Sequence, residues 1–435
     1  MIPTRRLLVL LLLGSLVIAG VSVTGLSLVA ILYFLTLLGV VIVDYAISPR
    51  PAQIEVERLI EPKLSLGAPN LVRLRVTNRS ARLIRAMLRD EYPYQLDADQ
   101  TVLHAQLLPF ATCELHYHVT PARRGEYHWG DLNLRYPTPL GLLQRQARYP
   151  AAQPIRVYPN VLNIRKYDLL ARKGLLHELG LRTSRIYGGG TEFERLREYT
   201  PDDEFRRINW KATARRLKPI AMEYEAERSQ QVVCAIDTGR LMRTPIGALQ
   251  KVDHAINAAL LASYVATLRG DQIGLLTFAD QVSAYLAPGK GRSQFYTMLE
   301  LLYNVESQPV EADYARALGY LSVKNRRRSL IVVFSDLVTL EAAQPLIAHL
   351  ARLARHHLPL LVLMSDPHVT RSARQTPQHT QQLYERAVAE QLLAERRLIL
   401  DTLQRAGVLT LDVPADQLSV ALINKYLELK TRGAL

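Results

Sequence analysis

The sequence has little of what nucleotide-binding and thiol-based proteins require. Its only two cysteines, Cys113 and Cys234, are far apart, so they form neither a disulfide framework nor a zinc-ligand spacing. No Gly-rich phosphate-binding motif follows a strand-like run, and the glycines at 188–190 are not followed by a phosphate-binding lysine. No Ser/His/Asp or Cys/His arrangement indicates nucleophilic catalysis. The sequence therefore favours a binding protein over an enzyme, with no small-molecule substrate or cofactor indicated.

Acidic residues are also in deficit. The 435 residues include 54 Lys and Arg against 40 Asp and Glu, which gives a formal net charge of +14. This balance favours acidic partners such as anionic lipid, nucleic acid or an acidic protein. It is equally typical of a membrane protein whose soluble part faces the cytoplasm, and we prefer that interpretation.

Long uncharged runs are present at the N-terminus. Residues 7–23 and 26–43 contain no charged side chain, and together they are nearly twice the ~20 apolar residues that one helix needs to cross a bilayer. We therefore predict a transmembrane helical hairpin over residues 1–46. Basic residues flank it on both sides: Arg5, Arg6, Arg50, Arg58 and Lys63. By the positive-inside rule they hold both ends, and all that follows, in the cytoplasm. The alternative is a cleaved signal peptide, against which the second apolar run argues.

Two soluble domains of different periodicity follow. Residues 47–160 contain short alternating runs, such as 71–78 and 113–119, which predict an antiparallel β-sandwich. Residues 229–430 contain continuous apolar runs separated by helical stretches, which predict a parallel sheet covered on both faces. The expected strands are 231–236, 272–278, 329–334, 358–364 and 408–413. The expected helices include 246–268, 340–356 and one from the Thr376-Pro377 pair to about residue 406. The fold class is thus α/β plus all-β.

The segment between these domains, residues 161–228, mixes acids, arginines and aromatics. One interpretation is a basic surface for an acidic partner, with Trp210 as its anchor. Its basic residues are Arg206, Arg207, Lys211, Arg215 and Arg216. The other interpretation is a brace in which ion pairs surround Trp210 and Tyr199, buried between the two domains. Its pairs join Arg197, Arg206 and Arg215 to Glu198, Asp203 and Glu227, and a helix starts near Thr200. Mixed charge favours the brace and makes nucleic acid unlikely.

Two strand-like runs of the C-terminal domain end in acids. Asp237 follows the run 231–236, and Asp336 follows the run 329–334. In open α/β sheets the ligand crevice lies at the carboxyl ends of the strands. Oxygen ligands of this type suit a divalent cation. Asp237 and Asp336 are therefore the candidate metal ligands.

These features together resemble the family called domain of unknown function 58. The resemblance covers nearly the whole chain, and its N-terminal part is carried by Arg124-Gly125-Glu126-Tyr127, Pro139-Leu140-Gly141-Leu142 and Val157-Tyr158-Pro159. Its most specific part is the charged segment. The residues that we assign there to the signature and to interaction are Arg197, Glu198, Tyr199, Asp203, Arg206, Arg207, Asn209, Trp210, Lys211 and Arg215.

The resemblance implies an Ig-like sandwich followed by a doubly wound, von Willebrand factor A-like Rossmannoid domain. Such domains often hold Mg²⁺ in a metal-ion-dependent adhesion site, Asp-x-Ser-x-Ser, with a Thr and an Asp from later loops. Here Gly239 and Leu241 replace the two serines, and no Thr stands at 311–313. We therefore expect no tight metal site. If the two aspartates hold Mg²⁺ weakly, Thr238 or Ser335 contributes a ligand. Alternatively, Arg240 replaces the metal and forms an ion pair with the aspartates.

The resemblance also implies partners. Members of that family are associated with MoxR-type AAA+ ATPases and with transglutaminase-like membrane proteins. The sequence thus predicts a membrane-anchored interaction or assembly factor in the bacterial inner membrane. Two alternatives remain: a metal-dependent hydrolase that uses Asp237 and Asp336, and a basic scaffold that binds anionic lipid or nucleic acid.

Overall fold

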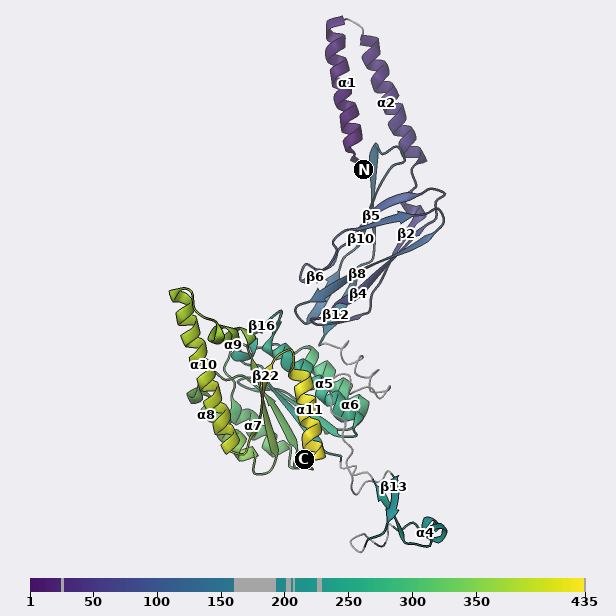
Figure 1. Cartoon of the computed structure of the whole chain (residues 1–435). Coiled ribbons are helices and arrows are strands. Elements are labelled where there is room, and N and C mark those ends of the chain that lie inside the picture. Colours follow the sequence, from purple (N-terminus) through teal and green to yellow (C-terminus); the bar gives the residue numbers. More distant parts are fainter. Residues whose placement is uncertain (25–26, 160–192, 201–204, 206–207, 225–228, 434–435) are drawn as a thin grey trace. The chain divides into compact units, whose positions relative to one another are not determined.

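The computed structural model describes residues 1–24, 27–159, 193–200, 205, 208–224 and 229–433 (Figure 1). They belong to two compact units, Met1–Tyr158 and Pro159–Leu435.

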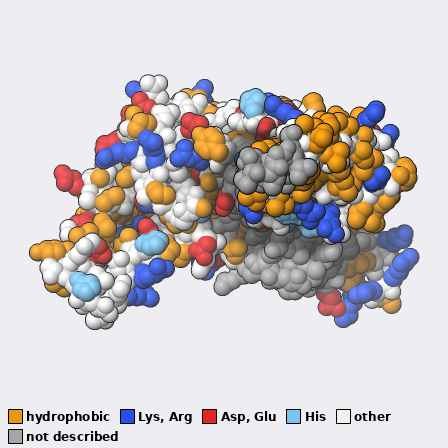
Figure 2. All heavy atoms as spheres, turned by 90° about the horizontal axis from the view of Figure 1, so that it is seen from above, with side chains coloured by type: hydrophobic (Ala, Val, Ile, Leu, Met, Phe, Trp, Pro, Cys, Tyr) orange, Lys and Arg blue, Asp and Glu red, His pale blue; other side chains and the backbone are white. Residues whose placement is uncertain are grey.

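The first unit begins with two helices, α1 (Arg5–Thr24) and α2 (Ser27–Ile47), which lie side by side (Figure 1). Gly14 permits their close approach, because a Cβ there would lie 2.8 Å from the Tyr33 ring. The Tyr33 hydroxyl donates to the Leu10 carbonyl at 2.7 Å. Hydrophobic side chains cover the outside of the pair (Figure 2). Among the described residues, Leu28–Gln53 is long and apolar enough to cross a membrane, as an anchor or a signal sequence would be.

A β-rich part follows α2. One antiparallel sheet has the order β2 (Ile54–Leu59), β4 (Asn70–Asn78), β8 (Thr112–Pro121) and β6 (Leu96–Ala98). A second has the order β1 (Ile2–Pro3), β11 (Leu143–Tyr149), β10 (Leu132–Pro137), β5 (Ile84–Asp90) and β7 (Leu103–Leu107). The third combines β3 (Lys63–Ser65), β12 (Gln153–Tyr158) and β9 (Gly125–Trp129). The alternation that predicted strands near 71–78 and 113–119 is confirmed, because every second side chain of β4 is buried.

A buried ion pair joins two of these sheets. Arg58 of β2 donates through Nε to Asp90 of β5 at 3.0 Å, and both side chains are at most 3% exposed. The same carboxylate accepts hydrogen bonds from the Tyr117 hydroxyl at 2.7 Å and from the Trp129 indole at 2.9 Å. Burial, together with the Asp90 charge, raises the pKa of Tyr117. Arg58, one of the basic residues that follow the apolar runs in the sequence, is thus buried in this ion pair.

The helix pair is fixed to the β-rich part by the loop Thr138–Leu142. The Asp44 carboxylate near the end of α2 is fully buried, and it accepts from the Thr138 hydroxyl and from the amide of Leu140 at 2.8 Å. Thr4, just before α1, donates to the Gly141 carbonyl at 2.6 Å. Strand β1 pairs with β11, so both ends of the helix pair lie against the same domain.

Part of the charged segment is described at the start of the second unit. Strand β13 (Phe193–Glu198) pairs with β14 (Ile220–Tyr224), and α4 (Trp210–Arg216) lies between them in the chain. Asn209 caps α4, because its side chain accepts from the Ala212 amide at 3.0 Å. The helix start predicted near Thr200 falls partly outside the described residues.

The rest of the second unit is a six-stranded sheet. Its order is β19 (Val282–Gly289), β18 (Gln272–Phe278), β15 (Gln231–Asp237), β20 (Leu330–Phe334), β21 (Leu358–Ser365) and β22 (Leu409–Pro414). One face is covered by α5 (Lys251–Leu268), α6 (Gly291–Tyr303) and α11 (Leu418–Thr431), and the other by α7 (Tyr314–Lys324), α8 (Leu340–Leu353) and α10 (Thr380–Arg405) (Figure 1). The five predicted strands are confirmed, and all pair in parallel.

Three details differ from the prediction. The antiparallel edge strand β19 was missed, because its half-buried residues lack a continuous apolar run. The helix expected from residue 246 starts at Lys251, since Gly247, with φ +65°, turns a short hairpin just before it. The helix expected from Thr376 starts at Thr380, and α9 (Pro367–Arg374) precedes it.

Candidate functional site

The two aspartates singled out in the sequence lie at the carboxyl edge of the sheet. Strand β15, between β18 and β20, ends at Asp237, and Asp336 follows β20 by two residues. Both residues are buried, with 2% and 4% of their surface exposed. Their carboxylates are held by different partners.

Asp237 is surrounded by hydrogen-bond donors. Its carboxylate accepts from the Ser335 hydroxyl at 2.6 Å, the Gly239 amide at 2.7 Å and the Tyr314 hydroxyl at 3.2 Å. Burial raises the pKa of the Asp237 carboxyl above its ordinary value, although these three hydrogen bonds oppose the shift. Burial and the neighbouring Asp237 charge also raise the pKa of Tyr314.

Asp336 is neutralised by two cations. The Lys251 ammonium, from the first turn of α5, forms an ion pair with one oxygen of Asp336. The Arg396 guanidinium of α10 lies 3.5 Å from the other oxygen, and it also forms a two-pronged pair with Asp412 at 2.8 and 2.9 Å. Arg240, expected as the cation here, instead pairs with the exposed Glu311 at 2.7 Å.

These contacts do not fit a magnesium ion. Mg²⁺ requires near-octahedral oxygen ligands, whereas the Asp237 carboxylate accepts three hydrogen bonds and Asp336 faces two cations, although its Oδ1 accepts no hydrogen bond. The Thr238 hydroxyl donates to the Phe278 carbonyl at 2.9 Å. A Cβ on Gly239 would lie 3.0 Å from the Val310 carbonyl, so the segment near Val310 occupies the space that a metal-binding serine there would need. The absence of a tight metal site stays a prediction, and these contacts give its physical reason.

A cleft of about 760 Å³ opens above Asp237. Apolar side chains form much of its wall, among them Leu241, Leu337, Val338 and Pro345. Tyr314 and Asp237 also line it, and the Arg240–Glu311 ion pair lies on it. A mostly apolar concavity with a few polar groups and a perturbed carboxyl is typical of a binding site.

The brace predicted for the charged segment stays a prediction, because its members Asp203, Arg206 and Glu227 lie outside the described residues. Glu198 pairs with Lys218 at 3.2 Å, and the Arg197 guanidinium donates to the Glu198 carbonyl at 3.2 Å. Trp210 is 59% exposed and packs edge-on against Phe205, with ring centroids 5.5 Å apart. Lys211 and Arg215 lie one helical turn apart on α4. The Tyr199 amide donates to the Pro219 carbonyl at 3.0 Å. The signature residues outside the described part are Asp203, Arg206 and Arg207.

Sequence reasoning missed Lys251, Tyr314 and Arg396. One signal for Lys251 was available, because a lysine in the first turn of a helix is disfavoured by the helix dipole and requires another partner. Tyr314 places a hydroxyl close to the position where the metal-site signature has a threonine. Because it is a tyrosine and not a threonine, the signature did not identify it. Arg396 gives no local signal, because it lies on a charged helix and meets Asp336 only through the fold.

The comparisons with known proteins place this domain. The family model described as protein of unknown function DUF58 matches residues 195–392, which confirms the predicted resemblance for that segment. A resemblance of the N-terminal part to that family stays a prediction.

Two similar proteins are described as uncharacterized. An uncharacterized protein of Mycobacterium tuberculosis is 29% identical over 199 residues, which are 45% of this chain and 60% of that protein. The uncharacterized protein YeaD of Bacillus subtilis is 25% identical over 28% of this chain and 30% of its own length. The chain thus spans less than two thirds of either relative. Among solved structures, BatB from Bacteroides thetaiotaomicron is 11% identical, with a TM-score of 0.32 over 47% of this chain and 99% of that one.

The raised pKa of Asp237 predicts a pH-dependent stability. A carboxyl of this kind stabilises the fold fully when protonated, below its unfolded pKa of about 3.9, and loses that contribution as the pH rises through the higher folded value. Asp237→Asn cannot ionise, so its free energy of unfolding should improve relative to the wild type between pH 4 and pH 7. Hydrogen exchange of the β15 amides at both values measures this difference. A constant difference would contradict the raised pKa.

Proposed function

We propose that this protein is a membrane-anchored interaction or assembly factor, whose α/β domain docks a partner protein in the cleft above Asp237. The cleft carries the proposal. Asp237 and Tyr314, which line it, hydrogen-bond to each other and to Ser335, so the cleft presents apolar walls and a charged rim. Such a surface suits an apolar side chain of a partner, surrounded by polar contacts. We do not extend the proposal to a hydrolase, because Asp237 is held by three hydrogen-bond donors, and Asp336 faces two cations and does not line the cleft.

The proposed fold and partners follow the family resemblance. The six-stranded domain is of the von Willebrand factor A type with a degenerate metal site, and the β-rich part is an Ig-like sandwich. The partners are a MoxR-type AAA+ ATPase and a transglutaminase-like membrane protein. The helix pair spans a bacterial inner membrane twice. Supporting this, β1 and β11 hold both ends of the pair at one domain, with Arg5 and Arg6 beside them.

A charge placed in the cleft tests the docking proposal. Val338 lines the cleft and is 40% exposed, so Val338→Arg should fold and yet block an apolar side chain. We expect at least a roughly tenfold loss of affinity for the co-purified AAA+ ATPase, the effect of losing a hot-spot contact. The measurement is capture of the ATPase from solubilised membranes, followed by titration with the purified ATPase.

The matched control is Val323→Arg. Val323 lies on α7 of the same domain, is 69% exposed and does not line the cleft. Equal binding by both variants and the wild type would refute docking in the cleft. If Trp210→Ala alone abolishes capture, the docking surface is the charged segment instead.

A further inference from the structure

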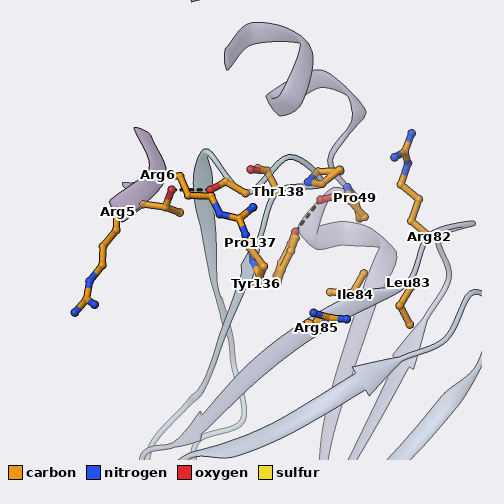
Figure 3. Close-up of a pocket in the computed structure, with 13 residues that line it drawn as sticks. Arg5, Arg6, Pro49, Arg82, Leu83, Ile84, Arg85, Tyr136, Pro137 and Thr138 are labelled. Atoms are coloured by element: carbon orange, nitrogen blue, oxygen red, sulfur yellow. Dashed lines mark hydrogen bonds between the residues drawn. The ribbon is translucent and has the colours of Figure 1, made fainter. Parts of the chain in front are cut away.

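A second cavity, of about 680 Å³, lies within the first unit at the foot of the helix pair (Figure 3). Four arginines line it. Arg5 and Arg6 begin α1. Arg85 lies at the start of β5, and Arg82 lies in the turn before that strand. In Figure 3 the Arg6 guanidinium lies by the loop at Pro137 and Thr138, and Arg85 lies beside Tyr136 and Ile84. Arg5 and Arg82 extend outward on opposite sides.

Basic side chains are not balanced by acidic ones in the lining of this cavity. None of the described residues that line it is acidic, and no ion pair in the described part of the chain involves any of the four arginines. Arg6 donates only to the Leu140 carbonyl, at 3.3 Å. Asp44 lies nearby at the end of α2, where its carboxylate accepts from Thr138, Leu140 and Leu142 and forms no ion pair with these described arginines. Arg6 and Arg85 face the cavity and Arg5 and Arg82 flank it, so the repulsion among these like charges is relieved when an anion binds, and guanidinium groups suit phosphate.

The position of the cavity indicates where this anion comes from. The cavity contacts Arg5 at the beginning of α1 and Pro49 just after the end of α2, the two points where the helix pair meets the domain. The neighbouring turns at this end of the domain expose large apolar side chains. These are Leu83 at 50%, Leu108 at 60% and Phe110 at 73% exposure. The Phe110 amide donates to Ser80 at 3.3 Å, and Ile84 pairs with Leu107, so these turns are adjacent.

Exposed apolar side chains beside arginines are the pattern of a surface that rests on a membrane interface. The lining itself is mixed. Besides the arginines it includes Leu83, Ile84 and three prolines, which suit the glycerol and upper acyl carbons of a lipid better than they suit a free, fully hydrated phosphate.

We propose that this cavity binds the phosphate headgroup of an anionic membrane phospholipid. The site rests on the membrane anchoring proposed above. The foot of the helix pair is then a lipid-binding site as well as the point where the domain is attached. A bound headgroup there fixes the depth at which the β-rich domain meets the bilayer.

Native mass spectrometry of the full chain in a neutral detergent tests the site. Three titrants are compared: phosphatidylglycerol, phosphatidylcholine, and glycerol 1-phosphate, which has the phosphate without acyl chains. The wild type should bind phosphatidylglycerol more tightly than the other two. In Arg82→Gln/Arg85→Gln its affinity should fall roughly 30-fold, because each basic residue near an anionic lipid contributes about fivefold.

The matched control is Arg73→Gln/Arg89→Gln. It removes two exposed arginines of β4 and β5 in the same domain, outside the cavity. It should bind phosphatidylglycerol as the wild type does. An equal loss in both double variants, or no loss in the cavity variant, would overturn the site. Binding of glycerol 1-phosphate as tight as that of phosphatidylglycerol would assign it to a soluble phosphate compound instead of a lipid.

Extraction of membranes at high pH separates this proposal from the anchoring on which it rests. A chain that is released by alkali contradicts the anchoring, and with it the lipid site. A chain that stays in the membrane fraction but shows no preference for phosphatidylglycerol contradicts the lipid site alone.

Discussion

Replacing Lys251 by Met should lower the free energy of unfolding of the α/β domain by about 3 kcal/mol, the lower end of the range for breaking a buried ion pair. The substitution leaves Asp336 buried, with only Arg396 at 3.5 Å, and Arg396 is already engaged by Asp412. Hydrogen exchange of the β15 and β20 amides in the full chain measures the change, because their slowest exchange reports opening of this sheet.

Two further variants sharpen this test. Arg240→Met breaks the exposed Arg240–Glu311 pair at the same edge of the sheet, and it should cost less than about 1 kcal/mol. Adding Asp336→Asn to Lys251→Met removes the stranded charge and should recover part of the loss. A Lys251→Met protein as stable as the Arg240→Met protein would show that Asp336 does not depend on Lys251.

Asp90→Ala should destabilise the β-rich part of the first unit by about 3–5 kcal/mol. The change removes the carboxylate that pairs with Arg58, and it leaves the hydroxyl of Tyr117 and the indole of Trp129 without their acceptor. Arg58 would keep hydrogen bonds to two carbonyls, those of Gly130 and Ala151, but no counter-charge. The amides of β4 and β8 should therefore exchange much faster.

The control is Glu114→Ala, on β8 of the same domain. It breaks a pair with Arg75 at 3.3 Å, in which both side chains are about half exposed. The expected cost is less than about 1 kcal/mol, since water solvates both charges in the variant. Similar costs for Asp90→Ala and Glu114→Ala would show that the buried network contributes no more than a surface pair.

The periodicity of the sequence predicted the buried strands well. It predicted the edge strand and the starts of two helices poorly. Continuous apolar runs located β15, β18, β20, β21 and β22, because a strand buried on both faces leaves no polar positions. Strand β19, at the edge, is half-buried and gave no such run. The boundary errors at Lys251 and Thr380 arose where a short hairpin and an extra helix precede the main helix.

The candidate site was predicted in position and not in composition. Chain order places Asp237 and Asp336 at strand ends, and a parallel sheet brings such ends to one edge. Their partners lie far away along the chain. Tyr314 lies 77 residues after Asp237, whereas Lys251 lies 85 residues before Asp336 and Arg396 lies 60 residues after it. Only packing of α5 and α10 against the sheet shows which cation meets which acid. The same holds for Arg58, whose partner Asp90 lies on a different sheet.

The pairing of β1 with β11 has a consequence for the order of events during synthesis. Ile2 pairs with Gln144, so the first residues of the chain have no partner until more than 140 further residues have been added. At about 5–20 residues per second, Ile2 waits roughly 7 to 30 seconds for this partner. The two apolar helices therefore emerge, and can enter a bilayer, before the domain that later closes over their beginning. A bulky group fused to Met1 would lie next to the place where β1 pairs with β11.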